Sequence, residues 1–500
     1  MGRSVDSFSI RRRASRWRHI WAALLAAALL YASLSTLSLT AHAEPLKPVV
    51  TVTRAAPHTL AYTLAPCVGV HTAPDQSAPL ITQLLGGTDV TLLDSATPGW
   101  SHVRVWSHTD GYVTSVGLSA SPPANDYAGD CTFPGVPDPQ PAAISAPKDP
   151  QPLQATARTT APTTLFAWPD THAAPLAGLS AGVALTIGQW ASDSAGKPWY
   201  HVSTPQGSGW LWSGDARLDE PDPATHMARG NPVWTGAAGK GMWFTNYLTR
   251  HADLAKLMAD AKASGMTHIY AEVAISKWGF YGANSLDRLL PVAHAQGITV
   301  IAWVYPTLAN ISSDIEMTRQ VVNYRTPSGD HADGLSTDVE ENTDPTSVYS
   351  YGQVVRGLIG PDTLMEDAAL HPFTHAEYPY AAIASTWNVI SPMNYWHSRY
   401  HHQYTAQDVK KFVTSSIVTI RAAMQAGGIA HPIPIEELGQ MYDMYSDDSA
   451  GVGHNPSGAE ITADIDAARS LGCIGVSYFE WQTATQDQWD AFSAYAWPRN

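Results

Sequence analysis

The sequence predicts a multidomain protein in which two small all-β barrels precede an α/β barrel of the TIM, or (β/α)8, type. Short strand-like segments separated by turn residues form a pattern that occurs twice before residue 219. After residue 222, strand-like and helix-like segments alternate to the end of the chain, which is typical of a parallel sheet with crossover helices. At 500 residues, the chain is long enough for several domains that each bury a core.

The first 43 residues have the features of an export signal. Arginines between Arg11 and Arg18 precede an apolar run from Ile20 to Leu39, and an A-x-A site ends at Ala43. Because the apolar run is also about long enough to span a bilayer, an uncleaved N-terminal anchor is the alternative. Both interpretations predict that residues 44–500 are secreted or extracellular.

Composition limits the partners and cofactors. The formal net charge of −15 argues against nucleic acid, because no basic surface is available to replace phosphate counterions. Cys67 and Cys131 bracket the first β-region and are predicted to form a disulfide in an oxidising compartment. Cys473 lies in an apolar run and is predicted to be a buried free thiol. We expect a monomer.

Residues 62–120 and 160–218 are predicted to be two copies of one small β-domain. A WSHV motif beginning at Trp100 corresponds to WYHV beginning at Trp199, and a G-[YW]-[VL] motif follows in both copies. The segment between them, 121–158, is rich in proline and is predicted to be an extended linker.

These repeated motifs resemble those of bacterial SH3-like modules. Each copy has a Gly turn leading into a Val-rich or Leu-rich strand, then W-x-x-V, then G-[YW]-[VL]. The resemblance implies that the two modules bind cell-wall peptides or pack against a catalytic domain.

Residues 228–500 are predicted to form the TIM barrel and to fold alone as the catalytic unit. Eight strand–helix pairs in this length match the size of such a barrel. The predicted strands are Met242–Tyr247, His268–Val273, Thr299–Tyr305, Gly334–Glu340, Thr363–Asp367, Val389–Tyr395, Ile433–Leu438 and Ile474–Trp481.

The carboxyl ends of the barrel strands are where such a fold places its active site. The polar and aromatic residues at these predicted ends are Asn246, Tyr247, Glu272, Trp303, Tyr305, Asp338, Glu340, Glu366, Asp367, Asn394, Tyr395, Glu436, Glu437, Tyr478, Glu480 and Trp481. Aromatic rings offer flat apolar faces to sugars, and carboxylates supply acid–base groups. The grouping predicts a polysaccharide-binding site.

The fourth predicted strand carries the strongest catalytic candidates. Asp338 and Glu340 are two residues apart and so point the same way from the strand end. Repulsion between two neighbouring carboxylates favours keeping one of them protonated, and a protonated acid is what glycosidic bond cleavage requires.

The segment Asp333–Glu340, DGLSTDVE, resembles the D-G-x-D-x-D-x-E signature of chitinase-type family 18 glycoside hydrolases. Met393-Asn394-Tyr395 is similar to that family's M-x-Y motif, and Trp481 ends the eighth predicted strand as the family's Trp does. Ser336 replaces the middle Asp of the signature, and Trp396 follows Tyr395 where the family usually has Asp.

This resemblance implies an acetamido-assisted hydrolase of an N-acetylhexosamine polymer such as peptidoglycan or chitin. Glu340 would be the general acid/base, Asp338 would orient the substrate acetamido group, and Tyr395 would donate a hydrogen bond to it. Trp481 would form the floor of the subsite. The remaining predicted substrate-binding residues are Trp303, Tyr305, Asn394, Glu436, Tyr478 and Glu480.

Two alternatives remain open at this point. The first is a retaining glycosidase with its acid at Glu340 or Glu341 and its nucleophile at Glu436 or Glu437. The second is a non-catalytic protein that binds cell-wall polysaccharide.

No cofactor is predicted. No phosphate-cradling Gly loop follows a strand, and three cysteines are too few for a thiolate zinc site. His397, His401 and His402 are predicted to be solvated loop residues, with a metal site as the alternative. Asp443, Asp447 and Asp448 offer oxygen ligands for calcium, although their spacing fits no EF-hand loop.

Overall fold

The structure is a computed structural model. It describes residues 59–64, 67–85, 88–94, 97–105, 109–121, 146, 149–398, 404–442 and 455–498. The following predictions therefore lie outside the described residues: the signal segment 1–43, Cys131, His401, His402, Asp443, Asp447 and Asp448. None of the helices within the described ranges is long and apolar enough to cross a membrane.

The first β-module is a seven-stranded sheet in the order β3-β2-β6-β5-β4-β1-β7. Its strands are β1 (Thr59–Thr63), β2 (Cys67–His71), β3 (Leu80–Leu85), β4 (Asp89–Asp94), β5 (Trp100–Val105), β6 (Thr109–Thr114) and β7 (Leu118–Ser119). Alternate residues of β5 are buried, with Val103 and Val105 fully inside, as a half-buried strand requires. Cys67 is disulfide-bonded, whereas Cys473 is a buried free thiol.

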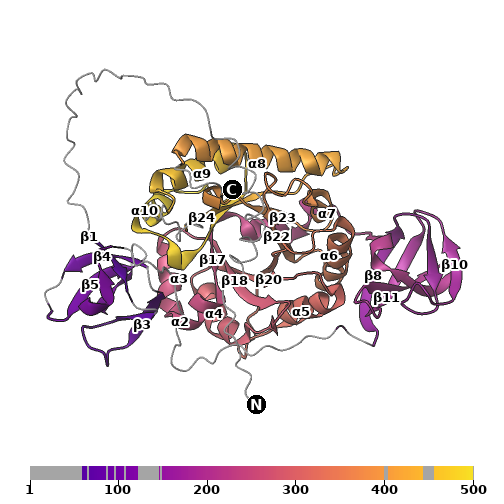
Figure 1. The fold of residues 1–500 in the computed structure, drawn as a ribbon. Helices are drawn as coiled ribbons and strands as arrows, with labels where there is room; N and C mark the ends of the chain where they lie inside the picture. Colours follow the sequence, from indigo (N-terminus) through magenta and orange to yellow (C-terminus); the bar gives the residue numbers. More distant parts are fainter. Residues whose placement is uncertain are drawn as a thin grey trace, which may run out of the picture. The chain divides into compact units, whose positions relative to one another are not determined.

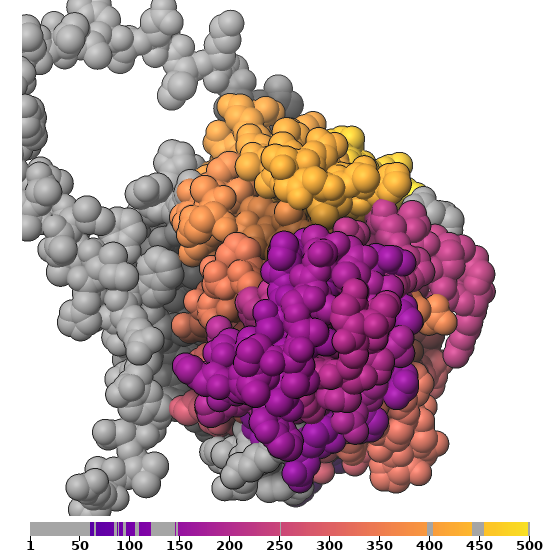
Figure 2. All heavy atoms as spheres, turned by 90° about the vertical axis from the view of Figure 1, so that its right-hand side faces the viewer, coloured from indigo at the N-terminus to yellow at the C-terminus, as the bar shows by residue number. Residues whose placement is uncertain are grey.

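The second β-module has the same strand order as the first, β10-β9-β13-β12-β11-β8-β14. Its strands are β8 (Gln151–Thr159), β9 (Thr163–Phe166), β10 (Pro175–Leu179), β11 (Ala184–Ser192), β12 (Pro198–Thr204), β13 (Gly207–Trp212) and β14 (Ala216–Leu218). In Figure 2 this module, coloured purple to magenta, faces the viewer.

The predicted linker 121–158 is too long, because β8 already begins at Gln151. Pro152 caused the error, since proline is rare inside strands. It pairs with Gln189 beside a register shift in β11, where the loss of one backbone N–H is tolerated.

The C-terminal region is a closed barrel of eight parallel strands, as predicted, to which the short strand β19 (Gly279–Phe280) is added antiparallel. The barrel strands are β17 (Gly239–Phe244), β18 (His268–Ile275), β20 (Thr299–Tyr305), β21 (Gly334–Thr337), β22 (Leu364–Leu370), β23 (Val389–Met393), β24 (Glu436–Gln440) and β25 (Gly475–Phe479). Figure 1 shows the strands inside a ring of helices.

The helices of this ring are α2 (Asn246–His251), α3 (Leu254–Ala263), α4 (Ala283–Ala295), α5 (Ile311–Asn323), α6 (Pro345–Ile359), α7 (Tyr380–Ala384), α8 (Ala406–Ala426), α9 (Gly458–Ser470) and α10 (Gln486–Ala494). Many begin at a side-chain cap. Thr405, Ser457 and Thr485 each form a reciprocal capping box at the start of α8, α9 and α10. These caps determine the residues at which α8, α9 and α10 begin.

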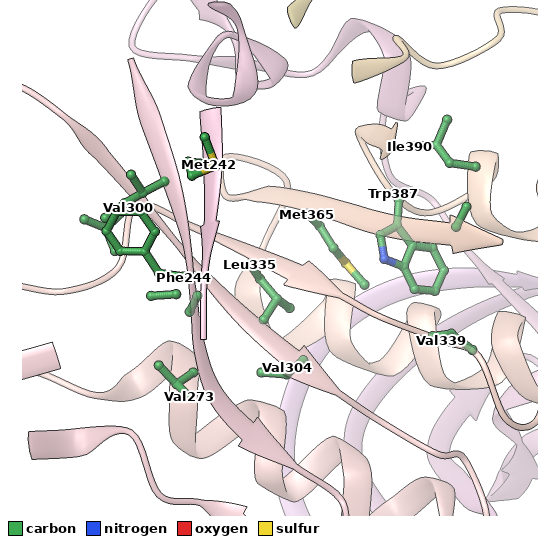
Figure 3. Close-up of a cluster of buried hydrophobic side chains, with 14 of the residues drawn as sticks. Met242, Phe244, Val273, Val300, Val304, Leu335, Val339, Met365, Trp387 and Ile390 are labelled. Carbon is green, nitrogen blue, oxygen red and sulfur yellow. The ribbon is translucent and has the colours of Figure 1, made fainter. Parts of the chain in front are cut away.

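Side chains alternate between two environments along each barrel strand. Those that point outward, such as Val304, Leu335 and Val339, form the apolar layer between strands and helices (Figure 3). Those that point inward include Trp243, Tyr270 and several polar groups. Because successive residues of a strand face opposite sides, Ser336 and Asp338 belong to the inner set.

Candidate active site

Asp338 and Glu340 lie in the chain directly after β21, which ends at Thr337. The backbone N–H of Asp338 donates to the Val304 carbonyl at 2.9 Å, which continues the pairing with β20 beyond the strand end. Val339, between them, is fully buried in the outer apolar layer, and Asp338 faces the inside of the barrel, where Trp303 contacts it. If the alternation of side chains continues past the strand end, Glu340 turns to the same side as Asp338. Asp338 is 4% exposed and Glu340 is half-buried. The buried carboxylate can orient a group, and the accessible one can exchange a proton with a substrate.

The Asp338 carboxylate is held by the aromatic layer of the barrel. The indole N–H of Trp303 donates to its Oδ2 at 3.2 Å. Trp303 in turn meets Trp243 edge to face at 5.1 Å, and Trp243 stacks on Tyr270 at 4.1 Å. This packing fixes the donor and therefore the direction of the Asp338 carboxylate.

A second aromatic group stands beside these carboxylates at the ends of β23, β24 and β25. Tyr395 lies 5.6 Å from Tyr442 and 6.4 Å from Phe479, and Phe479 meets Trp303 at 6.1 Å. Tyr395, Tyr442 and Phe479 are all half-buried, so part of each ring is available to a ligand. We call these three rings the aromatic wall.

Glu480 follows the aromatic wall and carries a proton near neutral pH. Burial, together with the nearby charge of Glu272, raises the pKa of Glu480 to about 8. The residue as a whole is half-buried, but its Oε2 is enclosed and finds no hydrogen-bond partner among the described residues. The Glu272 carboxylate, by contrast, accepts hydrogen bonds from the Tyr281 hydroxyl and from the backbone N–H of Asn246.

Two further predicted strand-end residues are half-buried. Tyr305, half-buried at the end of β20, donates its hydroxyl to Glu341 at 3.5 Å. Tyr247, in the first turn of α2, is also half-buried.

The predictions for Glu436 and Glu437 are wrong, because β24 begins at Glu436 rather than ending near it. Both residues have no exposed surface. Glu436 lies inside the barrel, where Ser391 and Ser477 donate to it at 3.0 and 2.9 Å. Glu437 points outward and accepts from Asn394 at 2.8 Å. Neither carboxylate can reach a sugar, so the two-carboxylate alternative loses its nucleophile.

Burial changes the charge of these interior carboxyls. It raises the pKa of Glu436 to about 8, against the hydrogen bonds from Ser477 and Ser391. Burial and the neighbouring Glu436 also raise the pKa of Glu366 well above its usual range, and Tyr270 donates to Glu366 at 2.7 Å. Asp367 points outward to Thr337 and Tyr378. Glu366 and Asp367 lie near the start of β22 and not at its end, which was also predicted wrongly.

Three more predicted binding residues are core residues. Trp481 is fully buried and packs on Trp489 at 4.6 Å and Phe244 at 5.2 Å, so its ring faces no open site. Tyr478 is fully buried and donates to Asp464 on α9 at 2.6 Å. Asn394 is likewise without exposed surface.

Phe479, and not Trp481, contributes its ring to the aromatic wall. Strand alternation contained the signal, since Ser477 points into the barrel and Phe479 must follow it on the same side. The residue type favours Trp481 as the sugar-binding ring, whereas the strand register favours Phe479. Tyr442 was missed because it stands beyond β24, whose end was placed too early.

The structure shows no candidate metal centre within its described part. No group of three or more His, Cys, Asp or Glu residues there could hold a metal ion. His397 is buried, and its imidazole contacts Glu460 at 2.8 Å, so the prediction of a solvated loop residue is wrong for it.

Comparisons with known proteins give one family match and several structural ones. Residues 70–116 match the model of the bacterial dipeptidyl-peptidase SH3 domain. No curated protein sequence matches the chain. The first β-module is thus SH3-like, and the last domain is a barrel of the TIM type.

The structural matches cover about half of the chain at low identity. The spore cortex-lytic enzyme SleL of Bacillus cereus is 9% identical over 51% of this chain and 73% of its own, with a TM-score of 0.38. A GH18 chitinase from Cycas revoluta, solved with (GlcNAc)3, is 12% identical over 51% and 97%, with a TM-score of 0.38. A putative chitinase A from Streptomyces coelicolor is 13% identical over 52% and 96%, with a TM-score of 0.35. Chitinase-type enzymes, which the motifs resemble, are thus among the structural matches.

Proposed function

We propose that the barrel is a glycoside hydrolase that cleaves an N-acetylhexosamine-containing polysaccharide, either peptidoglycan or a chitin-like polymer. The observation that carries this proposal is the unequal burial of Asp338 and Glu340, two carboxylates directly after β21. Asp338 is buried and held by Trp303, whereas Glu340 is accessible. The nearby aromatic wall supplies the apolar faces that a sugar ring needs.

The proposed reaction uses the acetamido group of the substrate as the nucleophile. Glu340 gives its proton to the glycosidic oxygen while the acetamido oxygen attacks the anomeric carbon and the glycosidic bond breaks. Asp338 holds the acetamido N–H, and the Tyr395 hydroxyl donates to the carbonyl oxygen. The Glu340 carboxylate then takes a proton from water, which opens the cyclic intermediate. Because the nucleophile comes from the substrate, no second enzyme carboxylate is required, and Glu436 can remain in the core.

Product analysis with active-site variants tests this proposal. The full chain is incubated with purified wall glycan and with chitin oligomers, and new reducing ends are measured. Glu340→Gln keeps the shape but removes the proton, so we expect a loss of about 10²- to 10⁴-fold in rate. Asp338→Asn should be similarly severe. Asp466→Asn, at an exposed carboxylate on α9, is the matched control and should keep full activity. An Asp338→Asn variant with normal activity would contradict acetamido assistance.

A non-catalytic role as a wall-binding protein is the second candidate. The observation that favours it is Ser336, which replaces a carboxylate of the resembled signature and whose buried hydroxyl has no partner among the described residues. If no reducing ends appear on any glycan while the protein co-sediments with it, this second function holds.

We further propose that residues 151–218 form a second SH3-like module and that both modules bind cell-wall peptides. The identical strand order of the two sheets supports the first statement. We also propose export, with the signal segment cleaved before Glu44. Sequencing the N-terminus of the exported protein tests this, since a chain that begins at Met1 would contradict cleavage.

A further inference from the structure

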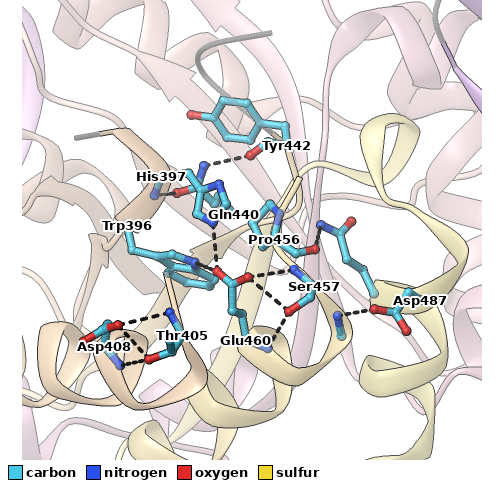
Figure 4. Close-up of polar contacts among 12 residues, drawn as sticks. Trp396, His397, Thr405, Asp408, Gln440, Tyr442, Pro456, Ser457, Glu460 and Asp487 are labelled. Carbon is cyan, nitrogen blue, oxygen red and sulfur yellow. Dashed lines mark hydrogen bonds and ion pairs between the residues drawn. The ribbon is translucent and has the colours of Figure 1, made fainter. Parts of the chain in front are cut away.

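A single buried carboxylate, that of Glu460, holds the two residues that follow Tyr395 of the aromatic wall. Glu460 lies in the first turn of α9 and is 6% exposed. Its Oε2 accepts from the Trp396 indole at 2.9 Å and contacts the His397 imidazole at 2.8 Å. Its Oε1 accepts from the backbone N–H and the hydroxyl of Ser457 at 3.1 and 3.0 Å. Figure 4 shows these contacts converging on one side chain.

Trp396 and His397 follow Tyr395 directly in the chain, so whatever fixes them also fixes Tyr395. The backbone N–H of His397 donates to Gln440 at 2.7 Å, and the Gln440 amide donates to the Tyr442 carbonyl at 2.8 Å. The cluster therefore holds the end of β23 against the end of β24. The rings of Tyr395 and Tyr442, which are 5.6 Å apart, stand at these two ends.

The charge of Glu460 is part of this arrangement. Burial alone would favour the protonated acid, but the contacts with His397, Ser457 and Trp396 outweigh it and lower the pKa of Glu460. A carboxylate is an acceptor at both oxygens, which is what donors converging on both sides require. An amide at this position could accept on one side only. The described groups that contact the carboxylate are the Trp396 indole, the His397 imidazole and Ser457. Tyr404 stacks on the His397 ring at 5.5 Å.

We propose that Glu460 is a positioning residue for the candidate active site, and that it acts through Tyr395. This inference rests on the proposed function, in which Tyr395 holds the acetamido carbonyl of the substrate. Loss of the Glu460 charge should therefore displace Tyr395 and weaken substrate binding more than it slows bond cleavage.

A double-mutant cycle between Glu460→Gln and Tyr395→Phe tests this on chitin oligomers. Glu460→Gln should raise KM by about tenfold with a smaller change in kcat. If Glu460 acts through the Tyr395 hydroxyl, this rise should nearly vanish in the Tyr395→Phe background. Effects that multiply independently would overturn the inference, because a general loss of structure does not depend on that hydroxyl. Asp466→Asn, at an exposed carboxylate on the same helix, is the matched control.

A second readout does not depend on activity. In protein labelled with 3-fluorotyrosine, the ¹⁹F resonance of Tyr395 is identified by its absence from Tyr395→Phe. Glu460→Gln should move it while resonances from the first β-module stay in place. An unmoved Tyr395 resonance would overturn the inference even if the protein cleaves glycans. A moved resonance in a protein that cleaves nothing would support the positioning and reject the proposed function. If Glu460→Gln does not fold, His397→Leu removes one contact of the same carboxylate and is measured instead.

Discussion

Protonated carboxyl groups distinguish the interior of this barrel, and their position decides what each can do. Glu480 stands at the strand ends beside the aromatic wall, whereas Glu436 is enclosed below it. Burial raises the pKa of both groups to about 8. Only the first is placed to give its proton to a ligand.

Glu480 should make substrate binding sensitive to alkaline pH. Below its pKa of about 8 the carboxyl can donate a hydrogen bond to a sugar oxygen, and above it the ionised group repels that oxygen. We expect KM to rise by about threefold to tenfold as pH passes 8. Glu480→Gln, whose amide donates at every pH, should show a flat KM between pH 6 and 9. Parallel KM profiles of variant and parent would contradict this role.

Glu436 should lower the stability of the fold as pH rises. Its pKa of about 8 in the folded state lies above the ordinary value of a free carboxyl, so the folded state binds the extra proton between these two values. Its contribution to stability is complete in acid and is lost as pH rises towards 8. Glu436→Gln removes this dependence while it keeps acceptors for Ser391 and Ser477.

We therefore expect the variant to gain about 1–3 kcal/mol relative to the parent between pH 5 and pH 8. Urea unfolding at both pH values measures it. A difference between variant and parent that is constant with pH would show that Glu436 is ionised in the folded protein.

At the scale of elements, the barrel strands show what a sequence can and cannot predict. The bounds of β20 were predicted correctly because TVIAWVY is a continuous apolar run between Gly297 and Pro306. The strand β24 was placed too early, because the apolar pair Ile433 and Ile435 looked like its start. Because of this error, Glu436 was predicted to lie at the mouth of the barrel, whereas it lies in the interior.

The partners of a buried carboxyl come from distant strands, which is why the sequence could not locate Glu436. Ser391 on β23 and Ser477 on β25 donate hydrogen bonds to Glu436. Neither serine differs in the sequence from an ordinary strand residue. The Asp338 and Glu340 pair could be predicted, because its signal lies within one strand. The Glu460 cluster could not, since it joins residues more than 60 apart in the chain.

The strand β25 gives a test that separates a binding residue from a core residue two positions away. Phe479→Ala removes a half-buried ring of the aromatic wall, so it should raise KM clearly and change stability little. Trp481→Ala empties a fully buried site against Trp489, so it should cost about 3–5 kcal/mol of unfolding free energy. Thermal melts and KM values for both variants decide it. A stable Trp481→Ala protein with weakened binding would restore Trp481 as the subsite floor.

At the scale of the molecule, the second β-module is joined to the barrel through one side of α6. The hydroxyls of Ser213 and Ser350 are 2.6 Å apart and both are fully buried. The backbone N–H of Leu218 donates to the Gln353 side chain at 2.8 Å. Leu153 packs so closely on Gly357 that a Cβ there would lie 3.1 Å from it. The α6 residues in these contacts lie three or four positions apart, as one side of a helix requires.

The barrel fragment 228–500 should therefore be less stable than the fragment 149–500. Without the second module, Ser350 loses Ser213, Gln353 loses Leu218 and keeps only Thr386, and the apolar surface around Gly357 is exposed to water. Each loss costs about 1–3 kcal/mol. We expect the melting temperature of the shorter fragment to fall by about 5 °C or more. The longer fragment should melt in one transition, because the module and the barrel share this buried contact. Gln353→Leu in the longer fragment removes the shared hydrogen bond from Leu218 and also the bond to Thr386 within the barrel, so it too should lower the melting temperature. Equal melting temperatures for the two fragments would mean that the module is an independent attachment and that α6 is complete without it.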